Sequence, residues 1–341
     1  MILPGRYLLA DTGAFVLVVL LTGAMRRVAL RYGVVDWPGK QKAHAGPTPY
    51  LGGVAIAFGA LAATGLAAPP FDPRILALLA AAVAMLLLGL LDDLKPLGVG
   101  VRVAVECTAA ALVVAAGARI GIIGRVPGLG YWPDIIITLM WIVLMTNSFN
   151  LLDNSDGAAG GIAVVTSAAL AAMAFGSGWE SLGVVQLALS AGCAGFLVYN
   201  WAPAKIFMGD AGSLFLGFVL SASAALLAHS SGPGPGRFWI VRICGLLLLT
   251  FVAAVDTSTV VLSRRRAGRS VVQGGTDHTA HRLRALGFGT SGAAALLSAG
   301  AGLSCAAGLL VVFGSLPAAV ALAVTIAIGI SLVGLAQRVR V

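Results

Sequence analysis

The chain has little charge. Only 10% of its 341 residues are Asp, Glu, Lys or Arg, whereas a soluble globular domain carries about 25%. Apolar residues make up 59% of the chain, and the mean hydropathy is +0.98. These values exclude a water-soluble enzyme and a disordered chain. They indicate a protein that folds in lipid.

Cysteine is also scarce. The four cysteines, Cys107, Cys193, Cys244 and Cys305, stand far apart and form no CxxC pair. This spacing excludes a disulfide framework and a zinc site, so we expect small packing residues. The net charge of +9 could suggest a nucleic-acid partner. In so apolar a chain we attribute the charge to membrane loops and expect no nucleic acid.

Long apolar runs are what the chain has in abundance. A membrane-spanning helix needs about 20 largely apolar residues. Eleven candidate spans meet this criterion: 8–25, 51–68, 75–91, 102–118, 134–151, 158–176, 181–199, 212–229, 238–257, 291–313 and 317–335. We do not expect the first to be a cleaved signal peptide, because Asp11 interrupts it. We predict an all-α polytopic membrane protein, a bundle of about 10–11 transmembrane helices.

Basic residues are distributed unevenly over the expected loops. If loop 26–50 is cytoplasmic, sixteen of the 22 Lys and Arg residues lie on the cytoplasmic side. The positive-inside rule then places the N-terminus outside and the C-terminus in the cytoplasm. We expect one integral-membrane domain over 1–341 in the cytoplasmic membrane, whose active-site face is formed by loops 26–50, 92–101, 152–157, 200–211 and 258–290.

Acidic residues gather on the same face. The chain has only thirteen, and eight of them fall at cytoplasmic helix ends or loops: Asp36, Asp92, Asp93, Asp153, Asp156, Asp210, Asp256 and Asp277. Carboxylates at a membrane edge are costly and mark functional sites. A scatter over both faces would suggest helix caps, whereas clustering on one face indicates a site.

The adjacent carboxylates of Asp92 and Asp93 repel each other unless a cation lies between them. Mg²⁺ suits such ligands, and it binds one or two carboxylates together with substrate phosphates. Asp153 and Asp156 are three residues apart and would share one helical face. The alternatives are a solvated helix end for the first pair and N-capping of the next helix by Asp156.

Two further segments carry groups suited to phosphate. The run from Gly209 to Gly212 offers bare backbone beside the Asp210 carboxylate, although it could be an ordinary turn. His278, His281 and Arg282 could hold phosphate or donate protons, although they could also form a solvated loop. Together, acids, a glycine turn, histidines and arginines on one membrane face suit Mg²⁺-assisted phosphoryl transfer.

At these residues the sequence resembles the polyprenyl-phosphate N-acetylhexosamine-1-phosphate transferases, which belong to glycosyltransferase family 4. The markers follow one another from Val35 to Gly287. They are Lys42-Ala43-His44 with Pro47-Thr48-Pro49-Tyr50-Leu51-Gly52-Gly53, Asp92-Asp93, Asn150 to Gly157, Phe207-Met208-Gly209-Asp210-Ala211-Gly212-Ser213, and the histidine loop.

The resemblance implies a reaction. A polyprenyl phosphate, with an undecaprenyl or decaprenyl chain, attacks the β-phosphorus of a UDP-amino sugar, UMP leaves, and a cell-envelope glycan is started. The donor is expected to be UDP-N-acetylglucosamine and the cofactor Mg²⁺, with Mn²⁺ as a substitute. The partners are these two substrates and membrane lipid, with a homodimer as an option.

The resemblance also implies residue roles. Asp210, Asp92 and Asp93 would bind the metal, and Asp92, Asp93, Asp153 and Asp156 would be catalytic. Asn150, Asn200, Phe207 and Gly209 would bind the nucleotide sugar, with Phe207 stacking on uracil unless it is only an interfacial anchor. Lys42, His278, His281 and Arg282 would contact phosphate. Direct displacement is favoured over a covalent step, for which Asp153 would be the nucleophile.

The sequence departs from the family pattern at three positions, and it fits the N-acetylglucosaminyl-type branch better than the pentapeptide-type branch. Asn154 replaces the first Gly of the usual Asp-Gly-x-Asp-Gly motif, Ala280 stands at one histidine position, and Gly275 stands where Asp is common. The pentapeptide-type branch, which transfers phospho-N-acetylmuramoyl-pentapeptide, carries a triple histidine that this chain lacks. A secondary transporter is the rival from another class, but it would place its ionisable residues near the bilayer midplane.

Overall fold

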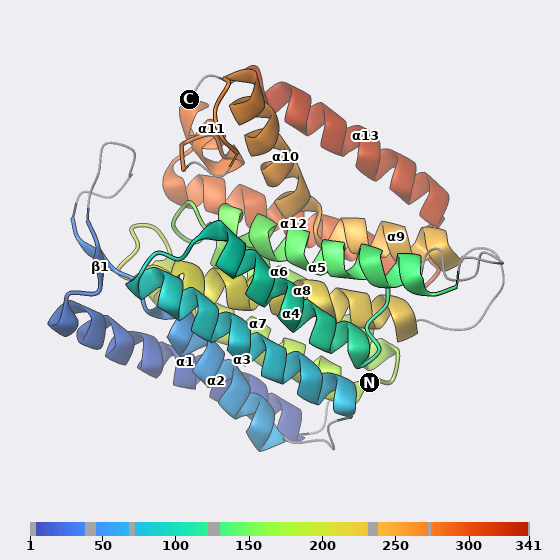
Figure 1. Cartoon of the computed structure of the whole chain (residues 1–341), viewed down its shortest axis with the longest axis horizontal. Coiled ribbons are helices and arrows are strands. Elements are labelled where there is room, and N and C mark those ends of the chain that lie inside the picture. The colour runs from blue at the N-terminus through green and yellow to red at the C-terminus, as the bar shows by residue number, and fades with distance from the viewer. Residues whose placement is uncertain are drawn as a thin grey trace.

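The computed structural model describes residues 5–37, 46–67, 72–121, 130–230, 238–271 and 274–339. Helices dominate these segments (Figure 1). They are α1 Gly5–Tyr32, α2 Gly52–Ala67, α3 Pro73–Leu94, α4 Val99–Ala115, α5 Trp132–Leu152, α6 Ala158–Gly176, α7 Glu180–Asn200, α8 Gly209–Ser230, α9 Phe238–Leu249, α10 Phe251–Arg266, α11 Thr279–Ala285, α12 Thr290–Val312 and α13 Ala318–Ala336.

The all-α polytopic fold is confirmed. Eight of the described helices are long and apolar enough to cross a membrane, and the α9–α10 pair adds a ninth candidate if it is one span. The remaining two predicted spans correspond to shorter helices. The α2 helix has 16 residues and α4 has 17, the latter with Arg102 and Glu106 in its first half.

The predicted span 238–257 is wrong in one respect, because it is not one straight helix. It breaks at Thr250, where α9 and α10 meet at an angle of 72°. The sequence of α10 explains the change of direction. Asp256, Ser263 and three arginines at its end make α10 far more polar than α9. The break therefore directs α10 toward the polar loops at one end of the bundle (Figure 1).

The predicted loop 26–50 also contains regular structure. Helix α1 continues to Tyr32, and strands β1 (Val35–Asp36) and β2 (Thr48–Pro49) then form an antiparallel pair. The strand pair is tied to the segment before α8, because Phe207 N donates to Pro49 O at 2.7 Å and Gly52 N donates to Phe207 O at 3.0 Å. The described strand pair is therefore held against the bundle.

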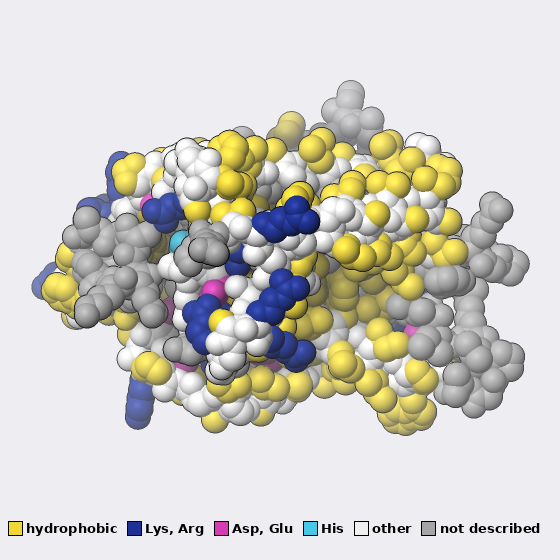
Figure 2. Space-filling view, turned by 90° about the horizontal axis from the view of Figure 1, so that it is seen from above, with side chains coloured by type: hydrophobic (Ala, Val, Ile, Leu, Met, Phe, Trp, Pro, Cys, Tyr) yellow, Lys and Arg dark blue, Asp and Glu magenta, His cyan; other side chains and the backbone are white. Residues whose placement is uncertain are grey.

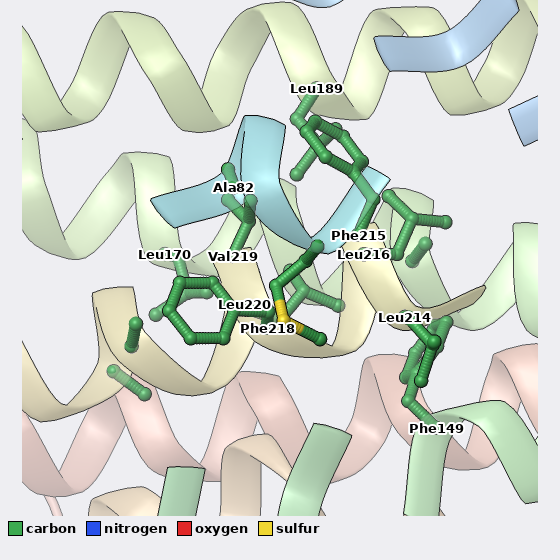
Figure 3. Packing of buried hydrophobic residues seen from close by; sticks show 14 of the residues in the cluster. Ala82, Phe149, Leu170, Leu189, Leu214, Phe215, Leu216, Phe218, Val219 and Leu220 are labelled. Carbon is green, nitrogen blue, oxygen red and sulfur yellow. The ribbon is translucent and has the colours of Figure 1, made fainter. Parts of the chain in front are cut away.

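Helix α8 is the centre of the fold. It is buried along its whole described apolar length, and α2, α3, α5, α6 and α9 pack around it. Figure 3 shows Phe215, Phe218 and Val219 of α8 among Ala82, Phe149, Leu170 and Leu189 from four neighbouring helices. Because lipid is as apolar as these side chains, close packing is what holds the helices together.

Glycines allow the closest helix approaches at the start of α8. A Cβ on Gly53 of α2 would lie 2.1 Å from Gly212 N, and one on Gly89 of α3 would lie 2.2 Å from Asp210 O. No side chain fits in either place. The first turn of α8 is therefore clamped between α2 and α3 by backbone contact, which fixes the position of Asp210.

Charge is concentrated at one end of the bundle. Figure 2 shows Lys and Arg side chains gathered around acidic and histidine side chains on one half of the molecule, whereas hydrophobic side chains cover much of the other half. The two chain ends lie at opposite ends of the bundle (Figure 1). This arrangement agrees with an odd number of membrane crossings.

The glycine contacts predict that Gly53→Ala destabilises the protein by about 3 kcal/mol, because its methyl group would overlap backbone atoms that cannot move aside. Thermal unfolding in detergent would measure the loss. Gly65→Ala is the matched control on the same helix, since nothing lies within 4 Å of its Cβ position. The control is expected to be neutral or slightly stabilising. Equal unfolding temperatures for the two variants would contradict the clamp.

Candidate functional site

The site is built around the first turn of α8. Asp93, near the end of α3, accepts hydrogen bonds from Asp210 N at 2.8 Å and from Ala211 N at 3.0 Å. A carboxylate from another helix thus caps the positive end of α8. Gly209 makes this approach possible. Its φ is +74°, and a Cβ there would lie 2.6 Å from an Asp93 carboxylate oxygen.

The Asp210 carboxylate is held from two sides. Asn150 Nδ2 donates to Asp210 Oδ1 at 2.7 Å and is also 2.8 Å from Ser213 Oγ. Arg102 Nη1 of α4 lies 3.5 Å from Asp210 Oδ2. Asn150, predicted to bind the nucleotide sugar, therefore lines the cavity while orienting Asp210.

Asp92 is an ion-paired, buried side chain. It is 9% exposed, lies 2.8 Å from Arg102 Nη1, and accepts from Leu97 N at 2.6 Å. The alternative of a solvated helix end is therefore wrong for Asp92. Arg102 places one guanidinium between Asp92 and Asp210, and this positive charge offsets part of their repulsion.

These groups face a cavity of about 750 Å³. Three segments supply five of the predicted acids to its wall, and the strand pair and the α11 region close it. The lining includes Val35, Asp36, Trp37, Tyr50, Asp92, Asp93, Asn150, Asp153, Asn154, Ser155, Asp156, Asn200, Phe207, Gly209, Asp210, Gly275, His281, Arg284 and Thr290. A volume of this size is typical of a pocket for a small-molecule substrate.

Asp153 is the acid without a partner. It follows the last residue of α5, and no donor contacts its carboxylate in the described segments. Burial and the nearby charges of Asp210, Asp93 and Asp156 raise its pKa to about 7. The cavity therefore carries more negative charge than its protein donors balance.

Asp156 does not cap α6, which was the alternative role that we considered for it. Its Oδ2 accepts from Ala204 N at 2.9 Å, and α6 begins after Gly157 with no side-chain cap. Gly157 has a φ of +74°, a conformation that favours glycine. Asp156 therefore connects the acidic loop to the segment between α7 and α8.

Two predicted nucleotide-binding residues also line the cavity. Phe207 is half-buried, and its backbone joins the strand pair. Asn200 is 4% exposed and uses its amide internally: Oδ1 accepts from Gly157 N at 3.0 Å and Nδ2 donates to Ile206 O at 2.9 Å. Asn200 therefore holds two loops together, whereas Phe207 has a ring that a base could stack on.

The histidine loop divides into two parts. His281 lines the cavity, and burial, with the charges of His278 and Arg284 adding to it, lowers its pKa to about 4. His278 is 4% exposed and lies outside the lining, with Nδ1 2.9 Å from Asp256 Oδ2. The structure therefore places His281 at the site, whereas His278 is buried in contact with Asp256 of α10.

Arg282 is also turned away from the cavity. It is 5% exposed, and its guanidinium donates to Asp277 O at 3.0 Å, Ser263 Oγ at 2.9 Å, Val339 O at 2.6 Å and Ala336 O. With these donors occupied, the expectation of phosphate contact by Arg282 is corrected to a structural role. Lys42, the other predicted phosphate contact, lies outside the described residues.

Two basic side chains at the site were not predicted. Arg102 lies at the start of the predicted span 102–118, and a charged residue at a membrane edge is itself a functional signal. Arg284 lies one helical turn after His281, and this spacing could have indicated a shared face. Glu106, on the same helix as Arg102, accepts a hydrogen bond from Asn147 of α5.

The donor set fits a divalent cation that arrives with its substrate. In the described segments no three His, Cys, Asp or Glu side chains are placed to hold an ion alone. Both oxygens of Asp92 and of Asp93 already accept hydrogen bonds. The unpartnered Asp153 and nearby Asp210 could supply the one or two carboxylates that Mg²⁺ takes beside phosphate oxygens.

Comparison with known proteins identifies the family. The sequence model of glycosyl transferase family 4 matches residues 75–228. A Bacillus subtilis protein, provisionally named as an undecaprenyl-phosphate N-acetylglucosaminyl 1-phosphate transferase, is 31% identical over 83% of this chain and 78% of its own length. The chain belongs to glycosyl transferase family 4. It is an enzyme of the transferase class, and the transporter alternative is set aside.

Two further relatives extend the comparison. A Streptomyces coelicolor protein, provisionally named as a glycosyltransferase, is 38% identical over 85% of this chain and 66% of its own length. A decaprenyl-phosphate N-acetylglucosaminephosphotransferase of Mycolicibacterium smegmatis is 30% identical over 83% of this chain and 77% of its own length.

The unpartnered carboxylate predicts a pH-dependent stability change for Asp153→Asn. Asp153 has a pKa of about 7 in the folded protein and an ordinary value of 3.8. Between pH 3.8 and about pH 7, Asp153 is protonated in the folded state and ionised in the unfolded state. The free energy of unfolding of the wild type therefore decreases as the pH rises to about 7. The advantage of Asp153→Asn over wild type should grow by about 2 kcal/mol between pH 5.5 and pH 8.

Unfolding at both pH values, without divalent cations, tests this expectation. Asn154→Ser is the control in the same loop, because it removes no titratable group. Its stability difference from wild type should be the same at both pH values. A pH-independent difference for Asp153→Asn would show that Asp153 does not carry the excess charge.

Proposed function

We propose that this enzyme transfers a sugar 1-phosphate from a UDP-amino sugar to polyprenyl phosphate, with Mg²⁺, and that it starts a cell-envelope glycan. The observation that carries the proposal is the convergence of five carboxylates on one cavity beside a buried helix start. The names of the Bacillus and Mycolicibacterium relatives favour N-acetylglucosamine as the sugar. Mn²⁺ is a second candidate for the cation.

The proposed reaction exchanges one diphosphate bond for another. An oxygen of the lipid phosphate forms a bond to the β-phosphorus of the donor. The bond between that phosphorus and the oxygen bridging to the α-phosphate breaks, and UMP leaves with the bridging oxygen. The product is a polyprenyl-diphospho-sugar that stays in the membrane.

The residues divide this work between binding and orientation. Asp210 and Asp153 would hold the cation, which neutralises phosphate charge when bound. Asn150 and Arg102 hold the Asp210 carboxylate, and Asp93 holds the Asp210 backbone N–H, through the contacts described above. Phe207 offers a ring face for uracil. We favour direct attack by the lipid phosphate, with Asp153 as the nucleophile only in a covalent route.

We infer that the chain is one integral-membrane unit in the cytoplasmic membrane, with the cavity on the cytoplasmic side. The positive-inside distribution of Lys and Arg supports this orientation. UDP-sugars are charged and soluble, so the donor would enter from water, while the polyprenyl chain stays in lipid. A homodimer stays a prediction.

UMP release by the purified protein tests the proposed function. We expect release only when undecaprenyl phosphate, Mg²⁺ and one member of a panel of UDP-amino sugars are all present, and loss of release with EDTA. The panel also includes the pentapeptide-type donor UDP-N-acetylmuramoyl-pentapeptide. No UMP release with any donor, from folded protein, would contradict the proposal. A burst of UMP without lipid would instead support the covalent route.

Asp210→Asn is expected to lower kcat by at least about 10³-fold, because the site loses a cation ligand. Asp72→Asn is the control, since Asp72 caps α3 at its other end, where it accepts from Arg74 N at 2.9 Å. Asn caps helices about as well as Asp, so the control should keep its activity. Near-normal turnover by Asp210→Asn would place the site elsewhere.

A further inference from the structure

The short helix α11 presents different side chains to its two sides. His281 and Arg284, three residues apart, both line the cavity. Arg282 is two residues from Arg284, a separation of about 200° around a helix. It is buried on the other side, against α10 and the end of α13. One helical turn thus aims one arginine at the site and one into the protein.

Arg282 fixes this turn in place. Its four hydrogen bonds reach the loop before α11, the end of α10 and two carbonyls at the end of α13. Cations at a helix C-terminus also interact favourably with the helix dipole. On the same side, Asp277 accepts from Arg264 Nε at 3.1 Å and from Arg269. The direction of Arg284 is therefore set by a rigid support.

Arg284 supplies a positive charge to a cavity whose other described charged lining residues are aspartates. Six aspartates line the cavity, and among the described lining residues Arg284 is the only Lys or Arg. It is half-buried, and no protein acceptor contacts its guanidinium within the described segments. A guanidinium with open donors in a cavity that carboxylates also line suits a phosphate that arrives with a cation.

We propose that Arg284 binds a phosphate group of a substrate in the cavity that Asp210 and Asp153 also line, and that Arg282 is its positioning residue. This inference rests on the proposed function. The phosphate comes from one of two sources, the diphosphate of the donor or the headgroup of the acceptor lipid. The guanidinium would hold two phosphate oxygens while the cation side holds the others.

The first test compares Arg284→Gln, Arg284→Lys and wild type in the UMP-release assay, with each substrate varied in turn. We expect kcat/KM to fall about 10- to 100-fold for Arg284→Gln, the effect of one charge-assisted hydrogen bond. Arg284→Lys should recover part of the loss. A KM increase for the donor alone assigns the diphosphate, and one for the lipid alone assigns the headgroup.

Arg266→Gln is the matched control. Arg266 is exposed at the end of α10 and does not line the cavity. Its removal lowers the positive charge of the same face without touching the site. Equal losses for Arg266→Gln and Arg284→Gln would mean that general surface charge, and not a phosphate contact, is responsible. Activity of Arg284→Gln within twofold of wild type would overturn the proposal.

A binding measurement separates this inference from the proposed function. Inorganic pyrophosphate with Mg²⁺ and a short-chain alkyl phosphate are the probes, and protection against thermal unfolding is the readout. Wild type should be protected by at least one probe, and Arg284→Gln should lose that protection while Arg266→Gln keeps it. If the wild type releases no UMP but the variants show this pattern of protection, the phosphate site is supported and only the proposed reaction is contradicted. Equal protection of all variants would overturn the site.

The positioning role of Arg282 predicts non-additive effects. If Arg282 acts through α11, Arg282→Gln and the double variant with Arg284→Gln should have nearly equal kcat/KM values. Arg282→Lys, which keeps the charge and one donor group, serves if Arg282→Gln does not fold. Losses that multiply in the double variant would show that the two arginines act independently.

Discussion

The hydrogen bonds from the first turn of α8 to Asp93 are the interactions on which the rest of the site depends. They join the end of α3 to the start of the most buried helix, at 2.8 and 3.0 Å. A helix start leaves N–H groups without partners, and lipid offers none. The Asp93 carboxylate satisfies two of them and, by doing so, holds Asp210 at the cavity wall.

This constraint explains why small residues surround α8. Gly53 and Gly89 let α2 and α3 approach until backbone meets backbone, and Gly209 admits the Asp93 carboxylate. The glycines and Asp93 therefore act together at the start of α8. The glycines bring the helices close, and the carboxylate ties them through hydrogen bonds. Membrane-embedded helices have little hydrophobic force between them, so such contacts matter more here than in water.

The electrostatics of the cavity follow from the same arrangement. Three chain segments bring five carboxylates together, and Arg102 balances only part of their charge. The surplus appears in the raised pKa of Asp153 and in the absence of an internal donor to it among the described residues. Arg282 does not offset this charge, because its guanidinium donates to protein acceptors that hold α11 in place. The cavity is thus arranged for a ligand that brings both cation and anion.

The sequence by itself determined the fold class, the family and most of the acidic site. Long apolar runs can only be membrane helices, and motifs such as Asp92-Asp93 and Phe207 to Ser213 are local in the chain. Only the tertiary structure decided the capping of α8 by Asp93 and which arginine of α11 faces the cavity. Those features depend on neighbours more than a hundred residues away in the chain or on the direction of a single turn, and local spacing does not encode either.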